Sequence, residues 1–151
     1  MKILVAFIVI FEVLCLSVVS NIYGDSTLDE LNSLIEHYGS NKEAMAPQEQ
    51  LECLNTLMSY NGKAVCETVY VTDVRISPSS AMWDTWGISF SLTPDSATVY
   101  GVIFGGPKTS PSLKQVATEL KKGQKIYFCG KISSASFNDP IIFTPEEIKP
   151  Q

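Results

Sequence analysis

The sequence predicts a mainly β fold: a five-stranded closed barrel with one helix between strands three and four, preceded by an α-helical N-terminal segment. The order of elements in the last third of the chain carries this prediction. A short amphipathic helix ends at residues 121–123 (Lys-Lys-Gly), and an apolar-rich strand follows over residues 124–132. A turn at residues 138–140 then leads into a short apolar strand. That order is typical of the second half of an oligonucleotide/oligosaccharide-binding (OB) fold.

Length and composition favour one globular domain. The chain has 151 residues, of which 45% are hydrophobic and 18% are charged. These values suit a folded domain of ordinary size and argue against disorder. Part of the apolar content lies in residues 1–24 and is not expected to belong to the core.

Residues 1–24 predict a signal peptide or an N-terminal anchor. Lys2 supplies a positive charge, residues 3–16 are nearly all apolar, and small residues follow up to Ser20, which is the order found in signal peptides. A retained anchor is the alternative, because residues 3–23 are just long enough to span a bilayer; a buried helix is a third. The prediction is an exported protein, periplasmic or secreted, that contacts a membrane only if this segment is retained.

Residues 25–61 predict an acidic helical segment. They carry seven acidic side chains and one basic side chain, Lys42. Apolar residues recur at helical spacing over residues 27–38 and again over residues 47–59, so we expect two helices, with Gly39 ending the first.

Residues 62–151 predict the barrel, and its first two strands are clear. Strand one is expected over residues 63–76, with a bulge near residues 66–67, where the alternation breaks. Strand two is expected over residues 85–92 and alternates strictly. Its large apolar residues should face inward (Trp86, Ile88, Phe90 and Leu92), and its small residues should face outward (Gly87, Ser89 and Ser91).

The remaining elements complete the OB order. Strand three is expected over residues 97–104. Ser110 then caps a helix over residues 112–121, with Pro111 at its start and Gly123 after its end. Strands four and five are expected over residues 124–133 and 141–144.

Three segments of this region resemble a known family: YNGKAV at residues 60–65, KKGQKIYFCGKIS at residues 121–133 and DPIIFTPEEI at residues 139–148. Together they resemble exported OB-fold proteins of the tRNA-anticodon-binding-like family. The resemblance implies the fold, and members of that family are often described as nucleic-acid binders by analogy. It carries no functional residue over to this chain.

The cysteines predict one disulfide. Beyond Cys15 the chain has Cys53, Cys66 and Cys129. Strands one and four are neighbours in a closed OB barrel, so Cys66 and Cys129 are the favoured pair. A bridge to Cys53 and a set of free thiols are the alternatives. No Cys-x-x-Cys motif indicates a redox site.

Catalysis finds little support in the sequence. His37 is the single histidine and lies in the acidic segment, outside the barrel. Glu146 and Glu147 are adjacent, so in an extended tail their side chains point apart. The sequence therefore predicts no enzyme, no metal site and no cofactor.

Binding is the better-supported class. The candidate ligand-binding residues are Trp83, Gly87, Ser89, Ser91 and Tyr100. Single-stranded nucleic-acid binders stack bases on outward aromatic rings and follow the backbone with positive charge. The basic residues that group in this sequence are Lys121, Lys122, Lys125 and Lys131. A binding module for a protein or an envelope polymer is the favoured function, and a single-stranded nucleic-acid binder is the alternative.

The export hypothesis makes a direct prediction about the mature chain. Mass spectrometry of the native protein should find an N-terminus between Asn21 and Asp25, because small residues precede these positions. An N-terminus at Met1, found in a membrane fraction, would favour the retained anchor.

Overall fold

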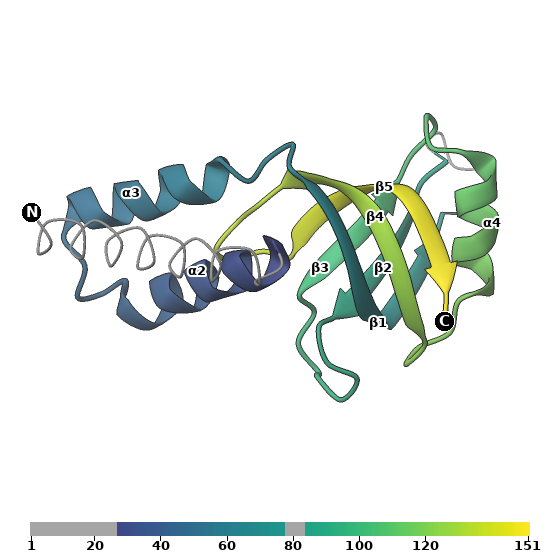
Figure 1. The fold of residues 1–151 in the computed structure, drawn as a ribbon, viewed down its shortest axis with the longest axis horizontal. Helices are drawn as coiled ribbons and strands as arrows, with labels where there is room; N and C mark the ends of the chain where they lie inside the picture. Colours follow the sequence, from purple (N-terminus) through teal and green to yellow (C-terminus); the bar gives the residue numbers. More distant parts are fainter. Residues whose placement is uncertain (1–26, 78–83) are drawn as a thin grey trace, which may run out of the picture.

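A computed structural model describes residues 27–77 and 84–151 (Figure 1). A hairpin of two helices leads into a five-stranded barrel, and one further helix lies between the third and fourth strands. The elements are α2 (Thr27–Asn41), α3 (Pro47–Met58), β1 (Ala64–Ile76), β2 (Trp86–Ser91), β3 (Gly101–Gly105), α4 (Pro111–Glu119), β4 (Lys125–Ser134) and β5 (Ile141–Pro150).

The strands form a closed barrel in the order β1-β2-β3-β5-β4. β1 pairs antiparallel with both β2 and β4, and β3 pairs parallel with β5 to close the barrel. This topology, with α4 between β3 and β4, confirms the predicted OB fold.

Aromatic rings fill the barrel interior. The rings of Phe90, Phe128 and Phe143 are fully buried, and their centroids lie 5.4 to 5.5 Å apart. Gly101 leaves room for them, since a Cβ at this position would lie 2.7 Å from both the Phe90 and the Phe143 ring. A glycine is therefore required where the backbone of β3 passes the aromatic cluster.

Helices cover the two ends of the barrel (Figure 1). At one end α2 buries Leu28 and Leu31 in the barrel core, and at the other α4 buries Ala117. The Tyr100 hydroxyl fixes α2 in place by donating a hydrogen bond to the Leu28 carbonyl at 3.0 Å. Tyr60 adds a second bond, from its hydroxyl to the Glu30 carboxylate at 3.2 Å.

Several predicted boundaries were wrong. The bulge in β1 lies at Thr72, where the pairing with β2 shifts between Val71 and Asp73, and not at residues 66–67. β3 begins only at Gly101, and α2 continues past Gly39 to Asn41, where the Asn41 amide donates to the His37 carbonyl at 2.9 Å.

The largest boundary error concerns β5, which runs to Pro150 instead of ending at residue 144. Residues 145–150 pair with the first half of β4 after a register shift opposite Gly130. Gly130 permits the shift because a Cβ there would overlap the Thr144 carbonyl oxygen. Glu146 and Glu147 thus belong to a strand and not to a tail.

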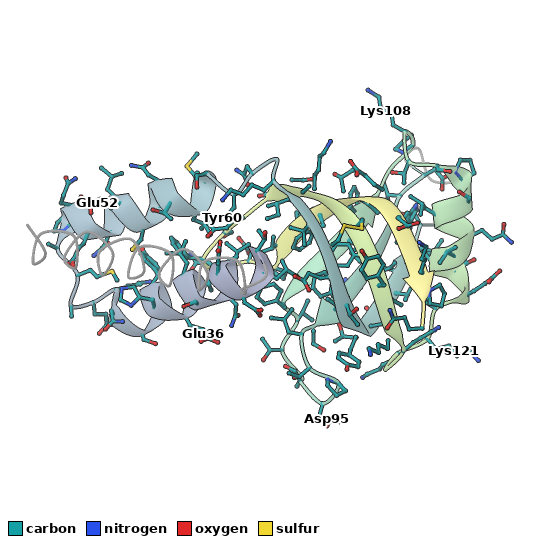
Figure 2. The ribbon with its side chains drawn as sticks, in the orientation of Figure 1. Glu36, Glu52, Tyr60, Asp95, Lys108 and Lys121 are labelled. Atoms are coloured by element: carbon teal, nitrogen blue, oxygen red, sulfur yellow. A yellow bond between two sulfur atoms is a disulfide. The ribbon has the colours of Figure 1, made fainter. Side chains whose placement is uncertain are left out.

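The predicted disulfide is confirmed. Cys66 and Cys129 are directly opposite each other on β1 and β4 and form a disulfide, which is the yellow sulfur–sulfur bond in Figure 2. The bridge encloses a sequence separation of 63 residues, so it removes much freedom from the unfolded chain. Cys53, on α3, is a free thiol.

Trp86 and Gly105 offer a test of the packing. The two residues face each other across β2 and β3, and a Cβ at Gly105 would overlap the Trp86 indole ring. We expect Gly105→Ala to lower the free energy of unfolding by about 1–3 kcal/mol, as overpacking does, measured by urea denaturation. Gly106→Ala is the matched control: a Cβ at Gly106 would meet no side chain or backbone atom of another segment within 4 Å, so stability should be nearly unchanged. Equal effects of the two substitutions would contradict the packing account.

Candidate binding site on the outer face of the barrel

A hollow lies on the outer face of β2 and β3 because small residues on one strand face large ones on the other. Trp86, Ile88 and Phe90 point inward, as predicted. The outward positions of β2 are Gly87 and Ser89, and they pair with Phe104 and Val102 of β3. Gly87 and Ser89 do not fill the space beside Phe104, and a groove of about 640 Å³ results. We call it the outer-face groove.

Apolar side chains dominate this groove. Phe104 is 45% exposed, and Ile76 and Val99 are 38% and 37% exposed. At one end the hydroxyls of Ser77 and Thr85 share a hydrogen bond of 2.8 Å. Pro140, from the β4–β5 connection, closes another side. Exposed apolar side chains gathered in a concave site are typical of an interaction surface.

Charge is sparse in the outer-face groove. Of the described residues that line it, Arg75 alone is charged, and its Nε lies 2.9 Å from the carboxylate of Asp73. The predicted group of lysines lies elsewhere and is not compact. Lys131 lies six residues after Lys125 on β4, which corresponds to about 20 Å along an extended strand. The ammonium group of Lys131 lies 3.2 Å from the carboxylate of Glu146. The groove therefore offers a phosphate backbone little positive field.

The structure places the predicted site residues differently. Gly87 and Ser89 line the outer-face groove. Ser91 does not face solvent: it is 1% exposed, and its hydroxyl donates to the Thr93 carbonyl at 2.7 Å, which satisfies it as the strand turns. Tyr100 is half-buried between the barrel and α2 and is not part of this groove. Trp83 lies outside the described residues.

Phe104 is the aromatic residue that sequence reasoning missed. It is outward and exposed on β3, and the residues that the sequence predicted for the binding site do not include it. The available signal was its position one residue after the inward Ile103. Residues 99–104 are almost all apolar, however, so polar–apolar alternation does not mark the outward side.

Other chemistry is limited in the part of the chain that the structure describes. No group of three or more His, Cys, Asp or Glu side chains gathers there in a way that would hold a metal ion. His37 is exposed on α2 and lies 3.4 Å from the amide nitrogen of Asn41. Among the same residues, no helix combines the length and the apolar character needed to cross a bilayer.

Comparison with known proteins supports the fold. No protein-family model matches the sequence, and no curated protein matches it, so the resemblance to the tRNA-anticodon-binding-like family stays a prediction. Two similar solved structures are the OBody proteins AM3L15 and AM3L09, each bound to hen egg-white lysozyme. Both have a TM-score of 0.50 over 61% of this chain, with 14% and 16% identity and coverage of 79% and 84% of the OBody chains. At this identity the likeness concerns the fold alone.

Tyr100 gives a prediction about pH. Burial, followed by the negative charges of Asp29 and Glu36, raises the pKa of Tyr100 well above its ordinary value of 10.0. As the pH rises, the unfolded chain therefore loses the Tyr100 proton before the folded chain does. The contribution of the protonated Tyr100 to the free energy of unfolding is complete below about pH 10 and is lost as the pH rises further.

Replacement of Tyr100 separates the effect of its hydrogen bond from the effect of its ionisation. Tyr100→Phe should cost about 1 kcal/mol at neutral pH through the lost hydrogen bond to Leu28, and it should make the decline in stability above pH 10 shallower. Urea denaturation at a series of alkaline pH values measures both. If Tyr100→Phe leaves the fall in stability above pH 10 unchanged, that fall is not caused by the ionisation of Tyr100.

Proposed function

We propose that this chain is an exported, non-enzymatic OB-fold binding module, and that its outer-face groove contacts another protein. The observation that carries the proposal is the exposed Phe104 ring beside the small Gly87, in a groove with little charge. An aromatic anchor in a concave apolar site is the feature that most often contributes binding energy at protein interfaces. An envelope polymer is the second kind of partner that the small residues and hydroxyls of the groove would suit.

Two further observations support parts of this proposal. OBody AM3L15 and AM3L09, which are similar to this chain in fold, are each bound to a protein, hen egg-white lysozyme. The disulfide between Cys66 and Cys129 suits an oxidising compartment, since disulfides persist in exported proteins and are rare in the cytosol. It thus agrees with the export signal predicted over residues 1–24.

A single-stranded nucleic-acid binder is the second candidate, and Phe104 is the observation that favours it. An outward ring on β3 is where such OB folds stack a base. The charge distribution argues against it, because Arg75 is paired with Asp73, and Lys131 is paired with Glu146 at a distance from the other lysines of the predicted group. We therefore expect no tight, salt-resistant binding to single-stranded DNA or RNA.

The test compares two probes on the purified native protein. A displayed library of random short peptides is selected for binding, and a fluorescent oligo-deoxythymidine is titrated at low and high salt. We expect peptides rich in apolar residues to be selected. Phe104→Ser should weaken their binding about tenfold or more, as loss of an aromatic anchor does. Leu51→Ser is the matched control, since Leu51 is a similarly exposed side chain (50%) on α3.

The results discriminate between the candidates. Peptide binding that falls with Phe104→Ser and not with Leu51→Ser supports the proposal. Salt-resistant binding of the oligonucleotide that falls with Phe104→Ser would overturn it in favour of the second candidate. Equal effects of the two substitutions would also overturn it.

A further inference from the structure

A second groove lies between α2 and the barrel. Asn32, Ile35 and Glu36 of α2 form one wall, and Tyr100 and Phe137 contribute to the other. Its volume is about 330 Å³, and a further hollow of about 260 Å³ continues it toward the β2–β3 connection. We call the two together the α2 groove. The helical segment that forms one of its walls lies outside the OB barrel.

The α2 groove is continuous with the outer-face groove. Val99 and Pro140 line both, so the two hollows meet at the start of β3 and the end of the β4–β5 connection. A bound segment of extended chain can therefore occupy both at once. The proposed protein-binding surface thus extends onto the helical hairpin.

Aromatic contacts hold the walls of the α2 groove in position. The rings of Tyr38 on α2 and Phe137 on the β4–β5 connection are stacked, with centroids 3.9 Å apart. The Tyr100 hydroxyl is already engaged by the Leu28 carbonyl, so it is the ring of Tyr100 that remains for a ligand. An ordered groove of this kind loses less conformational entropy on binding than a loose one.

The α2 groove is acidic, whereas the outer-face groove carries little charge. The charged side chains among the described residues that line the α2 groove are Glu36 and Asp139, both acidic. Glu36 accepts one hydrogen bond from the neutral Asn32 amide at 3.0 Å, and Asp139 accepts one from the Ser136 hydroxyl at 3.3 Å. Neither of these contacts neutralises the carboxylate. Burial is the main cause of the raised pKa of Tyr100, and the carboxylates of Asp29 and Glu36 raise it further, which agrees with a negative field at this groove.

We propose that the α2 groove binds a lysine or arginine side chain of the same protein segment whose apolar residues occupy the outer-face groove. This inference rests on the proposed function and names the chemistry of its partner: an extended peptide segment with an apolar part and a basic residue nearby. Carboxylates attract the cation, and Tyr100 lines the same groove, where an aromatic ring adds to the attraction of a cation. A second copy of this chain is a poorer occupant, because the helical hairpin is itself strongly acidic.

Substitutions at Glu36 test the charge without disturbing the core. Glu36→Gln keeps the shape of the side chain and removes its charge, and Glu36→Lys reverses the charge. Glu52→Gln is the matched control: Glu52 is an exposed carboxylate on α3 that likewise accepts from an amide four residues earlier, that of Gln48. Figure 2 labels Glu36 on α2 and Glu52 on α3.

The probe is the set of peptides selected by display on the native protein. We expect them to carry a lysine or arginine at a constant spacing from their apolar residues. Glu36→Gln should weaken their binding about threefold and Glu36→Lys about tenfold, while Glu52→Gln has no effect. Binding by the native protein should also weaken with added salt, and Glu36→Gln should reduce that salt dependence.

Each outcome decides between the two proposals. If Phe104→Ser abolishes binding while Glu36→Lys does not, or if the selected peptides lack basic residues, the α2 groove is not the site of a cation and the proposed function stands. If no peptide is selected, or if binding survives Phe104→Ser, both proposals are wrong. Loss of binding in Glu36→Lys and in Phe104→Ser, but not in Glu52→Gln, supports both.

Discussion

The packing of Phe90, Phe128 and Phe143 against the bare backbone of Gly101 is the constraint on which the rest of the structure depends. Three phenylalanine rings occupy the centre of a small barrel, and β3 can pass them only because Gly101 has no side chain. This packing fixes which side of β3 faces inward. As side chains alternate along a strand, it also fixes Val102 and Phe104 on the outside.

The surface follows from this arrangement. α2 and α4 cover the two ends of the barrel, and the exposed apolar residues Val99 and Phe104 gather on or beside β3. The small residues of β2 keep the neighbouring surface hollow. The helical hairpin does more than cover an end, because the wall it contributes extends the hollow and gives it an acidic part. A partner that fills both grooves must present apolar side chains to one and a basic side chain to the other. Two such requirements together make binding more specific than either alone.

The sequence was sufficient for the features that depend on local pattern. The inward positions Trp86, Ile88 and Phe90 of β2, the proline at the start of α4, and the neighbouring positions of Cys66 and Cys129 in an OB order each had a clear signal, and the structure confirms them. The extension of β5 had none, since residues 145–150 contain two prolines and three charged residues, and their pairing is imposed by β4. The candidate site was predicted in part: Gly87 and Ser89 were identified, while the outward position of Phe104 is set by core packing and not by its own neighbours in sequence.

The central claim is that a protein segment binds across the outer-face groove. Nuclear magnetic resonance of the native protein, titrated with a selected peptide, tests this most directly, because the backbone amides that shift reveal the contact surface. The account predicts the largest shifts at Gly87, Ser89, Val102 and Phe104, with a second group on α2 around Glu36. Shifts confined to α3, or to the outer surface of β4 and β5 around Lys131 and Lys149, would contradict it.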